Sequence, residues 1–339
     1  MNFDLNHKFN TFENNAGIKS SLIIENCKRE KYDVSIMIPT YNRPVLLLET
    51  LFSAIKQKTS LSYEIVIIDD TPECVINNDI ISIINNENNC AIRYFHNDTN
   101  IGLFGNWNRC IELARAEWFT ILNDDDILAD SWLDDMMALK DNNSFVGCRC
   151  KRFTDIKEIS SYFQSGYFRK EKVRHKIVPI EHLFFGMWTN GTLGTLLNKK
   201  IALDIGGFDE KLYPMSDWHF YFKYANVKKL KIINENLVFN RWLENESMKL
   251  DVVKGQIKTN LEFRTFLLRS DLLRLSPIKY ISYRFIGHVI MAKAMRIAEK
   301  EYSTFSFSKE SKRIGFSSLY LRVISFFPYG KIKKIMNIL

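Results

Sequence analysis

Short apolar runs alternate with amphipathic stretches through the first 140 residues of the chain. Four apolar runs rich in β-branched or aromatic residues predict strands at residues 34–38, 64–68, 92–96 and 118–122. Stretches with helical periodicity follow at residues 45–57, 105–116 and 130–140. Alternating strands and helices predict an α/β fold in which helices cover both faces of a mainly parallel sheet.

The pattern changes after residue 250. Long amphipathic stretches at residues 261–275 and 283–302 predict helices there. The composition therefore predicts three parts: an N-terminal extension over residues 1–30, an α/β domain over residues 31–250, and a helical region over residues 251–339.

Positive charge is concentrated in the helical region. The whole chain carries +8, residues 251–339 carry +11, and the first 250 residues carry −3. A basic end predicts an anionic partner, either lipid headgroups or nucleic acid, and the alternative is a solvated helical surface. No nucleic-acid recognition motif accompanies the charge, so we expect no nucleic acid partner.

Polar residues follow three of the predicted strands. They are Thr40, Tyr41 and Asn42 after the first strand, the pair Asp69 and Asp70 after the second, and residues 123–126 after the fourth. In α/β sheets ligands bind outside the carboxyl ends of the strands, so these ends predict a ligand site.

The motifs Pro39-Thr40-Tyr41-Asn42-Arg43, Ile67-Ile68-Asp69-Asp70 and Leu122-Asn123-Asp124-Asp125-Asp126, in this order, resemble those of family 2 glycosyltransferases. The resemblance covers roughly residues 33–241. It implies a GT-A fold, which is Rossmann-like with a mixed, mainly parallel sheet, followed here by a C-terminal helical extension. It also implies a nucleotide-binding half over about residues 31–140 and an acceptor half over about residues 141–250.

By this resemblance the three strand ends bind the nucleotide, and one carboxylate of the Asp69–Asp70 pair accepts a hydrogen bond from the uracil imide. The alternative for Asp70 is capping of a helix. Arg241 contacts the pyrophosphate or, alternatively, forms a surface salt bridge. The residues implied to bind nucleotide are Pro39, Thr40, Tyr41, Asn42, Arg43, Asp69, Asp70, Asn100, Gly102, Asn106, Asn123, Asp124 and Arg241.

The acidic turn at residues 123–126 is implied to bind Mn²⁺ or Mg²⁺, with Asp125 and Asp126 as metal ligands. Hard carboxylate oxygens suit either ion, which would neutralise charge on the departing diphosphate. The family's Asp-x-Asp pattern falls on Asn123 and Asp125, so Asp125 is the preferred ligand. The register with Asp124 and Asp126 stays open, as does a turn that only caps the next helix.

Residues 206–218 resemble the family's acceptor-side segment, and Asp217 is implied to be the catalytic base. An inverting transfer needs a base on the acceptor hydroxyl, opposite the leaving group. The alternative is that Ser216 or Asp217 caps a helix. The small residues of Gly191–Thr195 are expected beside the donor sugar.

The resemblance implies a metal-dependent glycosyltransferase similar to bacterial enzymes of O-antigen or capsule synthesis. The expected donor is a nucleotide sugar, UDP-linked, and the expected acceptor is a lipid-linked saccharide, to which one sugar is added with inversion. The alternatives are a nucleotidyltransferase and a non-catalytic nucleotide-binding relative. The sequence does not predict an oligomeric state.

The chain contains no signal-length apolar segment and no run of about 18 apolar residues, and its six cysteines are scattered. These features predict a cytoplasmic protein. Residues 319–339 combine Leu, Ile and Phe with Arg322, Lys331, Lys333 and Lys334. This segment predicts either a peripheral position on an anionic membrane surface, at the inner face of the cytoplasmic membrane, or a helix packed on the catalytic domain.

Overall fold

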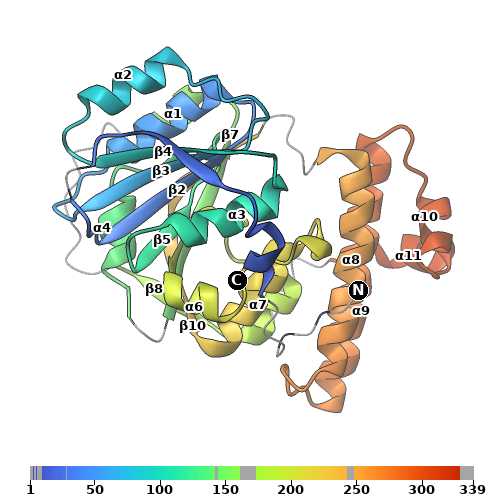
Figure 1. Ribbon diagram of the computed structural model, residues 1–339. Coiled ribbons are helices and arrows are strands. Elements are labelled where there is room, and N and C mark those ends of the chain that lie inside the picture. Colours follow the sequence, from blue (N-terminus) through green and yellow to red (C-terminus); the bar gives the residue numbers. More distant parts are fainter. Residues whose placement is uncertain are drawn as a thin grey trace.

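The computed structural model describes residues Phe3 and Leu5 and the ranges 10–27, 29–141, 144–160, 173–242 and 248–328. A twisted sheet forms the centre of the molecule, and the C-terminal helices stand beside it as a separate group (Figure 1). Part of the segment that precedes β8 and the last eleven residues of the predicted basic tail lie outside the described residues.

The described strands form one sheet in the order β1-β4-β3-β2-β5-β9-β7-β10-β6, with β8 paired to β10. Strands β4, β3, β2 and β5 are parallel to one another, whereas β9 is antiparallel to both of its neighbours. The strands are β1 Ser20–Glu25, β2 Val34–Thr40, β3 Tyr63–Asp69, β4 Ala91–Asn97, β5 Trp118–Ile121, β6 Ile127–Leu128, β7 Ser144–Phe153, β8 His175–Val178, β9 Thr195–Asn198 and β10 Lys229–Arg241.

Alternate side chains of the central strands enter two different cores. Ile36 and Ile38 of β2 belong to one apolar cluster, whereas Met37 belongs to the other. This alternation follows from the two-residue period of a strand, and it requires apolar residues at every position when both faces are covered. All seven positions of β2 are buried, and its two polar residues, Ser35 and Thr40, donate hydrogen bonds to Glu64 and Asp124.

Helices cover both faces of the sheet (Figure 1). Helices α1, α2 and α4 pack in the cluster that contains Ile36, and α3, α6 and α7 pack in the cluster that contains Met37. These helices are α1 Pro44–Ile55, α2 Asn78–Asn86, α3 Gly102–Leu113, α4 Trp132–Met137, α6 Lys199–Asp204 and α7 Ser216–Val227, and the 3-10 turns are η1 Thr11–Asn15, η2 Ile156–Ile159, η3 Ile180–Phe185 and η4 Glu210–Leu212.

The first C-terminal helices pack directly on the α/β part. Phe263 of α8 is fully buried against Trp218 and Phe222 of α7, with ring centroids 5.2 Å apart in both pairs. The guanidinium of Arg264 lies 4.5 Å from the centroid of the Trp218 ring. The helices of this region are α8 Leu250–Arg269, α9 Pro277–Glu301, α10 Phe307–Arg313 and α11 Ser318–Ile324.

A smaller apolar cluster joins the outer helices to one another. Met295 of α9, Phe307 of α10 and Leu321 of α11 are buried in it. Helices α8 and α9 thus pack on the α/β part, while α10 and α11 lie on the outer side (Figure 1). Helix α11, from the segment 319–339, packs in the outer cluster. Within the described ranges, no helix combines the length and the apolar character that a membrane span requires.

The predicted fold class, a GT-A-like mixed sheet followed by helices, is confirmed. Strand β1 and helix α2 are among the elements that were not predicted. Strand β1 pairs antiparallel with β4 and adds the sheet's edge, yet its residues alternate poorly because most of them are partly or fully exposed. Helix α2 is short and buries Ile80 and Ile84, whereas Ile81 and Ile83 are half-buried. Residues 11–25, within the predicted N-terminal extension, therefore form part of the main fold.

Candidate active site

The site lies where the strand order changes direction. Strands β3 and β4 follow one another on one side of β2, and β5 lies on its other side. A crevice at such a switch point is the usual ligand site of an open parallel sheet. The register places Thr40 opposite Asp69, and Met37 opposite Ile121, so the loops that follow β2, β3 and β5 leave the same edge of the sheet.

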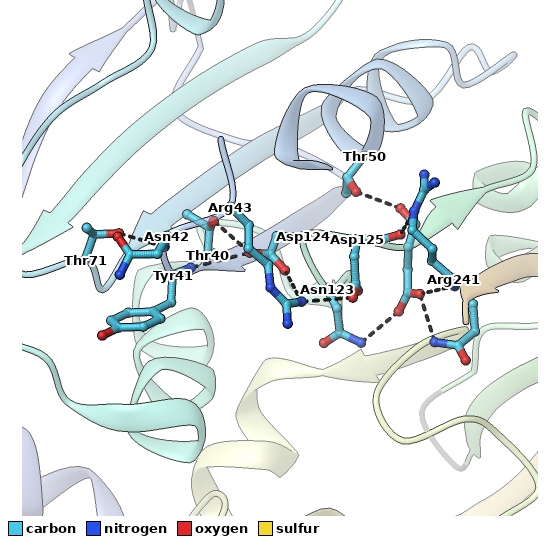
Figure 2. Close-up of polar contacts among 12 residues, drawn as sticks. Thr40, Tyr41, Asn42, Arg43, Thr50, Thr71, Asn123, Asp124, Asp125 and Arg241 are labelled. Carbon is cyan, nitrogen blue, oxygen red and sulfur yellow. Dashed lines mark hydrogen bonds and ion pairs between the residues drawn. The ribbon is translucent and has the colours of Figure 1, made fainter. Parts of the chain in front are cut away.

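Side chains join the loop after β2 to the loop after β5. The Thr40 hydroxyl donates a hydrogen bond to Asp124 at 2.8 Å, and the backbone N–H of Tyr41 lies 3.4 Å from the same carboxylate oxygen (Figure 2). Asp124 is buried, and burial raises its pKa to about 6. Asp124 therefore fixes the two loops relative to each other.

Asp126 braces the opposite side of the acidic turn. One of its oxygens accepts hydrogen bonds from Asn240 Nδ2 at 2.9 Å and from the backbone N–H of Arg241 at 3.0 Å, and the other accepts from Asn123 Nδ2 at 2.9 Å. Its side chain is fully buried, and this burial, followed by repulsion from Asp125, raises its pKa to about 7.

The metal-ligand role of Asp126 stays a prediction, and in this structure its carboxylate is already engaged. Three donors surround it, so Asp126 stabilises the turn. Asn123 is likewise engaged, because its side-chain amide donates to Asp126. The sequence preferred Asp125 only through the family's Asp-x-Asp pattern and did not indicate these partners of Asp126.

Asp125 points to a different partner. Its Oδ2 lies 2.9 Å from the guanidinium of Arg43, which also lies 3.5 Å from Asp124 (Figure 2). Burial raises the pKa of Asp125, and the neighbouring Arg43 opposes that rise. Of the three aspartates, Asp125 makes the shortest contact with this partly exposed cation.

Arg241 is buried, which corrects the alternative of a surface salt bridge. Its Nε donates to the backbone oxygen of Asp125 at 3.0 Å, and its guanidinium is paired with Glu49 and lies 4.7 Å from the centroid of the Phe153 ring. Arg241 thus holds the end of β10 against the acidic turn.

A cavity of about 470 Å³ opens beside Arg43. Its walls combine polar groups from the strand ends with apolar groups from the helices. Four of the residues that line it were predicted from the sequence: Thr40, Asn42, Arg43 and Asp69. The remaining lining residues are Pro44, Leu47, Thr71, Pro72, Glu73, Val75, Asn77, Ile80 and Tyr94. The sequence predicted only the lining residues at the strand ends. Most of the other lining residues come from the loop before α2 and from helices, and the apolar periodicity of those helices is typical of ordinary core residues.

Asp69 is held in place at the edge of this cavity. The hydroxyl of Tyr94 donates to its Oδ2 at 2.7 Å, and the backbone N–H of Thr71 donates to its Oδ1 at 2.9 Å. Each carboxylate oxygen can accept more than one hydrogen bond, so Asp69 keeps acceptor capacity for a ligand.

Asp70, which was predicted to contact nucleotide, is not among the residues that line the cavity. Its carboxylate accepts from the backbone N–H groups of Ile101 and Gly102, at 2.9 and 3.0 Å, and from Asn97 Nδ2 at 2.8 Å. It therefore satisfies donors at the start of α3, which is the capping alternative.

The residues predicted at the start of α3 also serve the fold. Asn106 is buried and donates to the backbone oxygen of Ile68 at 3.0 Å. Asn100 is exposed and accepts from the N–H of Gly102, whose φ of +75° suits glycine. None of the three lines the cavity, and neither do the buried Pro39 and the half-exposed Tyr41.

Asp217 lies in the first turn of α7, next to the turn that precedes β9. A Cβ built on Gly191, whose φ is +60°, would lie 3.4 Å from Asp217 Oδ2. Met215, rather than Ser216 or Asp217, occupies the N-cap position, and Asp217 Oδ1 accepts from the N–H of Trp218 at 2.7 Å. Burial raises the pKa of Asp217 to about 6.

The sheet brings Asp217 to the edge that carries the acidic turn. Strand β9 is antiparallel to β5, with Phe119 opposite Leu197, so β9 begins at the edge where β5 ends. The Gly191 turn immediately precedes β9, and Asp217 lies beside that turn.

The site fits a divalent cation that is shared with a substrate. Among the described residues, no group of three His, Cys, Asp or Glu side chains converges as a metal cage would require. Mg²⁺ and similar ions are commonly held by one or two carboxylates together with substrate phosphates. Asp125 is the carboxylate available for that arrangement.

Comparisons with known proteins agree with the resemblance. Residues 35–190 match the model of the family described as "Glycosyl transferase family 2". An uncharacterised glycosyltransferase of Methanocaldococcus jannaschii is 26% identical over 66% of this chain and 75% of its own length. A GalNAc(5)-diNAcBac-PP-undecaprenol beta-1,3-glucosyltransferase of Campylobacter jejuni is 24% identical over 90% of this chain and 97% of its own length.

Solved structures show the same fold. TarS 1-349 of S. aureus, in complex with UDP-GlcNAc, gives a TM-score of 0.51 at 15% identity and covers 90% of this chain and 91% of its own. The mannosyltransferase PcManGT of Pyrobaculum calidifontis, in complex with GDP-Man and Mn²⁺, gives 0.50 at 14% identity over 91% and 85%. The predicted resemblance to family 2 glycosyltransferases is therefore confirmed.

The aspartates of the turn should differ in their effect on stability. Replacement Asp126→Ala leaves three donors, two of them buried, without their acceptor and should lower the free energy of unfolding by about 2 kcal/mol. Asp125→Ala removes one contact to a partly exposed arginine and should change it by less than about 1 kcal/mol. Urea unfolding at pH 7.5 without metal measures both. An equal loss of unfolding free energy in the two variants would contradict the conclusion that Asp126 stabilises the turn.

Proposed function

We propose that this chain, with its sequence resemblance to family 2 glycosyltransferases and its GT-A fold, transfers one sugar from a nucleotide-sugar donor to a lipid-linked saccharide. The donor is UDP-linked, and the sugar is transferred with inversion during synthesis of a surface polysaccharide such as O-antigen or capsule. The observation that carries this proposal is that Arg43, which lines a cavity together with Thr40 and Asp69, is paired with Asp125 of the acidic turn.

The cavity suits a nucleoside. Leu47, Ile80 and Tyr94 supply apolar and aromatic surface for a base, and Asp69 supplies a fixed acceptor that matches an imide N–H. This chemistry favours uracil over cytosine, which has no imide N–H. The C. jejuni relative, a glucosyltransferase, and the TarS structure, a complex with UDP-GlcNAc, support a nucleotide-sugar donor.

Asp125 would hold the Mn²⁺ or Mg²⁺ ion together with the diphosphate of the donor. Such an ion neutralises charge on the departing nucleoside diphosphate. The Arg43 guanidinium, which lines the same cavity, supplies a second positive charge near that diphosphate. Asp124 and Asp126 keep the turn in position, so a bound ligand need not reorganise it.

Asp217 would remove the proton from the acceptor hydroxyl as that oxygen attacks the anomeric carbon. A carboxylate with a pKa near 6 is ionised at neutral pH and is a stronger base than an exposed aspartate. The Gly191 turn leaves space beside it, because a Cβ at that position would already lie in contact with Asp217 Oδ2.

The outer C-terminal helices would attach the enzyme to an anionic membrane that contains the acceptor. Leu319 and Val323 lie one turn apart on α11 and are 75% and 64% exposed, and Phe326, just beyond α11, is 74% exposed. Arg296 lies 4.4 Å from the centroid of the Phe326 ring. Exposed apolar side chains beside basic ones match the interface of an anionic bilayer. Lys331, Lys333 and Lys334 lie outside the described residues.

Titration calorimetry with UDP, GDP and dTDP, each with and without Mn²⁺, tests the donor and metal assignments. We expect UDP to bind tightly only with Mn²⁺ and Asp125→Ala to lose at least about tenfold in that affinity, because one charged ligand is missing. GDP and dTDP are the controls for base selection. If no diphosphate binds under either condition, the proposal fails.

Asp217→Asn should bind UDP and Mn²⁺ like the wild type but lose at least about 100-fold in kcat, since the amide cannot accept the proton. For the wild type, kcat should fall as the pH drops through about 6, where Asp217 becomes protonated. Single-turnover transfer between pH 5 and 8 measures this limb. A variant that retains full turnover would exclude Asp217 as the base.

The double variant Leu319→Ser/Val323→Ser should sediment less with liposomes that contain phosphatidylglycerol, with its partition coefficient reduced at least about tenfold. Its UDP affinity should not change. Deletion of α11 is a less specific test, because Leu321 and Ile324 are buried in the helical cluster.

The control Val227→Ser removes a side chain that is 53% exposed, at the end of α7. It should sediment like the wild type. Equal sedimentation of all three proteins, or equal binding to neutral phosphatidylcholine liposomes, would contradict the membrane assignment.

A further inference from the structure

Arg43 lies between the nucleotide cavity and the acidic turn. It lines the cavity together with Thr40 and Asn42, and its guanidinium contacts Asp125 at 2.9 Å and Asp124 at 3.5 Å. Figure 2 shows the side chain extended from the loop after β2 toward these carboxylates. Arg43 is therefore within reach of both the proposed diphosphate position and the proposed metal ligand.

The backbone that carries Arg43 is fixed. The preceding residue, Asn42, has a φ of +54°, and its N–H donates to Thr71 Oγ1 at 3.0 Å. Pro44, the following residue, begins α1. The side chain itself is 36% exposed, whereas those of Asp124 and Asp125 are 9% and 7% exposed. A change of partner at this position thus needs only side-chain rotation.

Arg43 and a divalent cation would use the same oxygen. Asp125 Oδ2 accepts from Arg43, and a metal ion bound to this oxygen would lie within a few ångströms of the guanidinium, where two like charges repel each other strongly in a partly buried site. Phosphate oxygens are the alternative partner, because a planar guanidinium forms paired hydrogen bonds with them.

We propose that Arg43 is a positioning residue that exchanges its carboxylate partner for the donor's diphosphate, and that this exchange makes metal binding depend on nucleotide. With Arg43 on Asp125, metal affinity is low. When a diphosphate draws the guanidinium away, Asp125 becomes available to the ion. Each ligand therefore raises the affinity for the other by the same factor. The inference rests on the proposed function and adds the coupling between the two ligands.

Direct Mn²⁺ titration of the full chain, followed by electron paramagnetic resonance of free Mn²⁺, tests the exchange with and without saturating UDP. Without nucleotide, Arg43→Gln should bind Mn²⁺ at least about fivefold more tightly than the wild type, because a competing charge is removed. The factor by which UDP raises Mn²⁺ affinity should be smaller in Arg43→Gln than in the wild type. Arg43→Lys keeps the charge but lacks the paired donors, and its Mn²⁺ affinity should lie between the two.

The matched control is Lys58→Gln, which removes a cation paired with Asp130 at 2.6 Å, away from the cavity lining. It should behave like the wild type. If Arg43→Gln binds Mn²⁺ no more tightly than the wild type without nucleotide while wild-type UDP binding still requires Mn²⁺, the exchange is excluded and the proposed function stands. If the wild type binds neither UDP nor Mn²⁺, both fail. Thermal unfolding verifies that the variants are folded. If Arg43→Gln does not fold, the Mn²⁺ affinity of Arg43→Lys tests the exchange.

Discussion

Burial of three consecutive carboxylates on one turn is the constraint around which this site is built. A buried negative charge is costly unless hydrogen bonds or a cation compensate it, and one partner cannot serve all three. Asp124 uses the loop after β2, Asp126 uses the end of β10, and Asp125 uses Arg43. The acidic turn consequently connects elements that lie far apart in the sequence. The negative charge of Asp125 is compensated by the Arg43 guanidinium.

The sheet topology makes these partners available. Because β2 lies between β3 and β5, the residues that follow all three strands meet at one edge. The antiparallel strand β9 brings the Gly191 turn, and Asp217 beside it, to that same edge. A site that takes its cation-facing carboxylate from one loop and its proposed base from a helix about 90 residues later therefore needs no large insertion.

The C-terminal helices have two different relations to the site. Helix α8 supports it, because Phe263 and Arg264 pack on Trp218, the residue after Asp217. Trp218 also donates from its indole to the backbone oxygen of Leu183 at 2.9 Å, so the first turn of α7 is held from two sides. Helix α11 instead leaves apolar side chains exposed on the outside of the molecule. One contiguous basic region thus combines a structural part with a surface part.

The sequence by itself determined the alternation of strands and helices, the strand ends that carry chemistry, and the family resemblance, because buried strands need apolar residues and strand ends are local features. The resemblance ranked Asp125 first among the aspartates of the turn, but only the tertiary structure showed that Asp125 and Asp126, and likewise Asp69 and Asp70, have different partners. Neighbours in a sequence look alike, but their side chains leave a turn in different directions, and the partners that decide their roles, such as Asn240 for Asp126 and the start of α3 for Asp70, are distant along the chain. The same reason explains why the cavity lining contributed by α1, α2 and β4 was not predicted: those residues follow ordinary core periodicity, and only folding places them around one space.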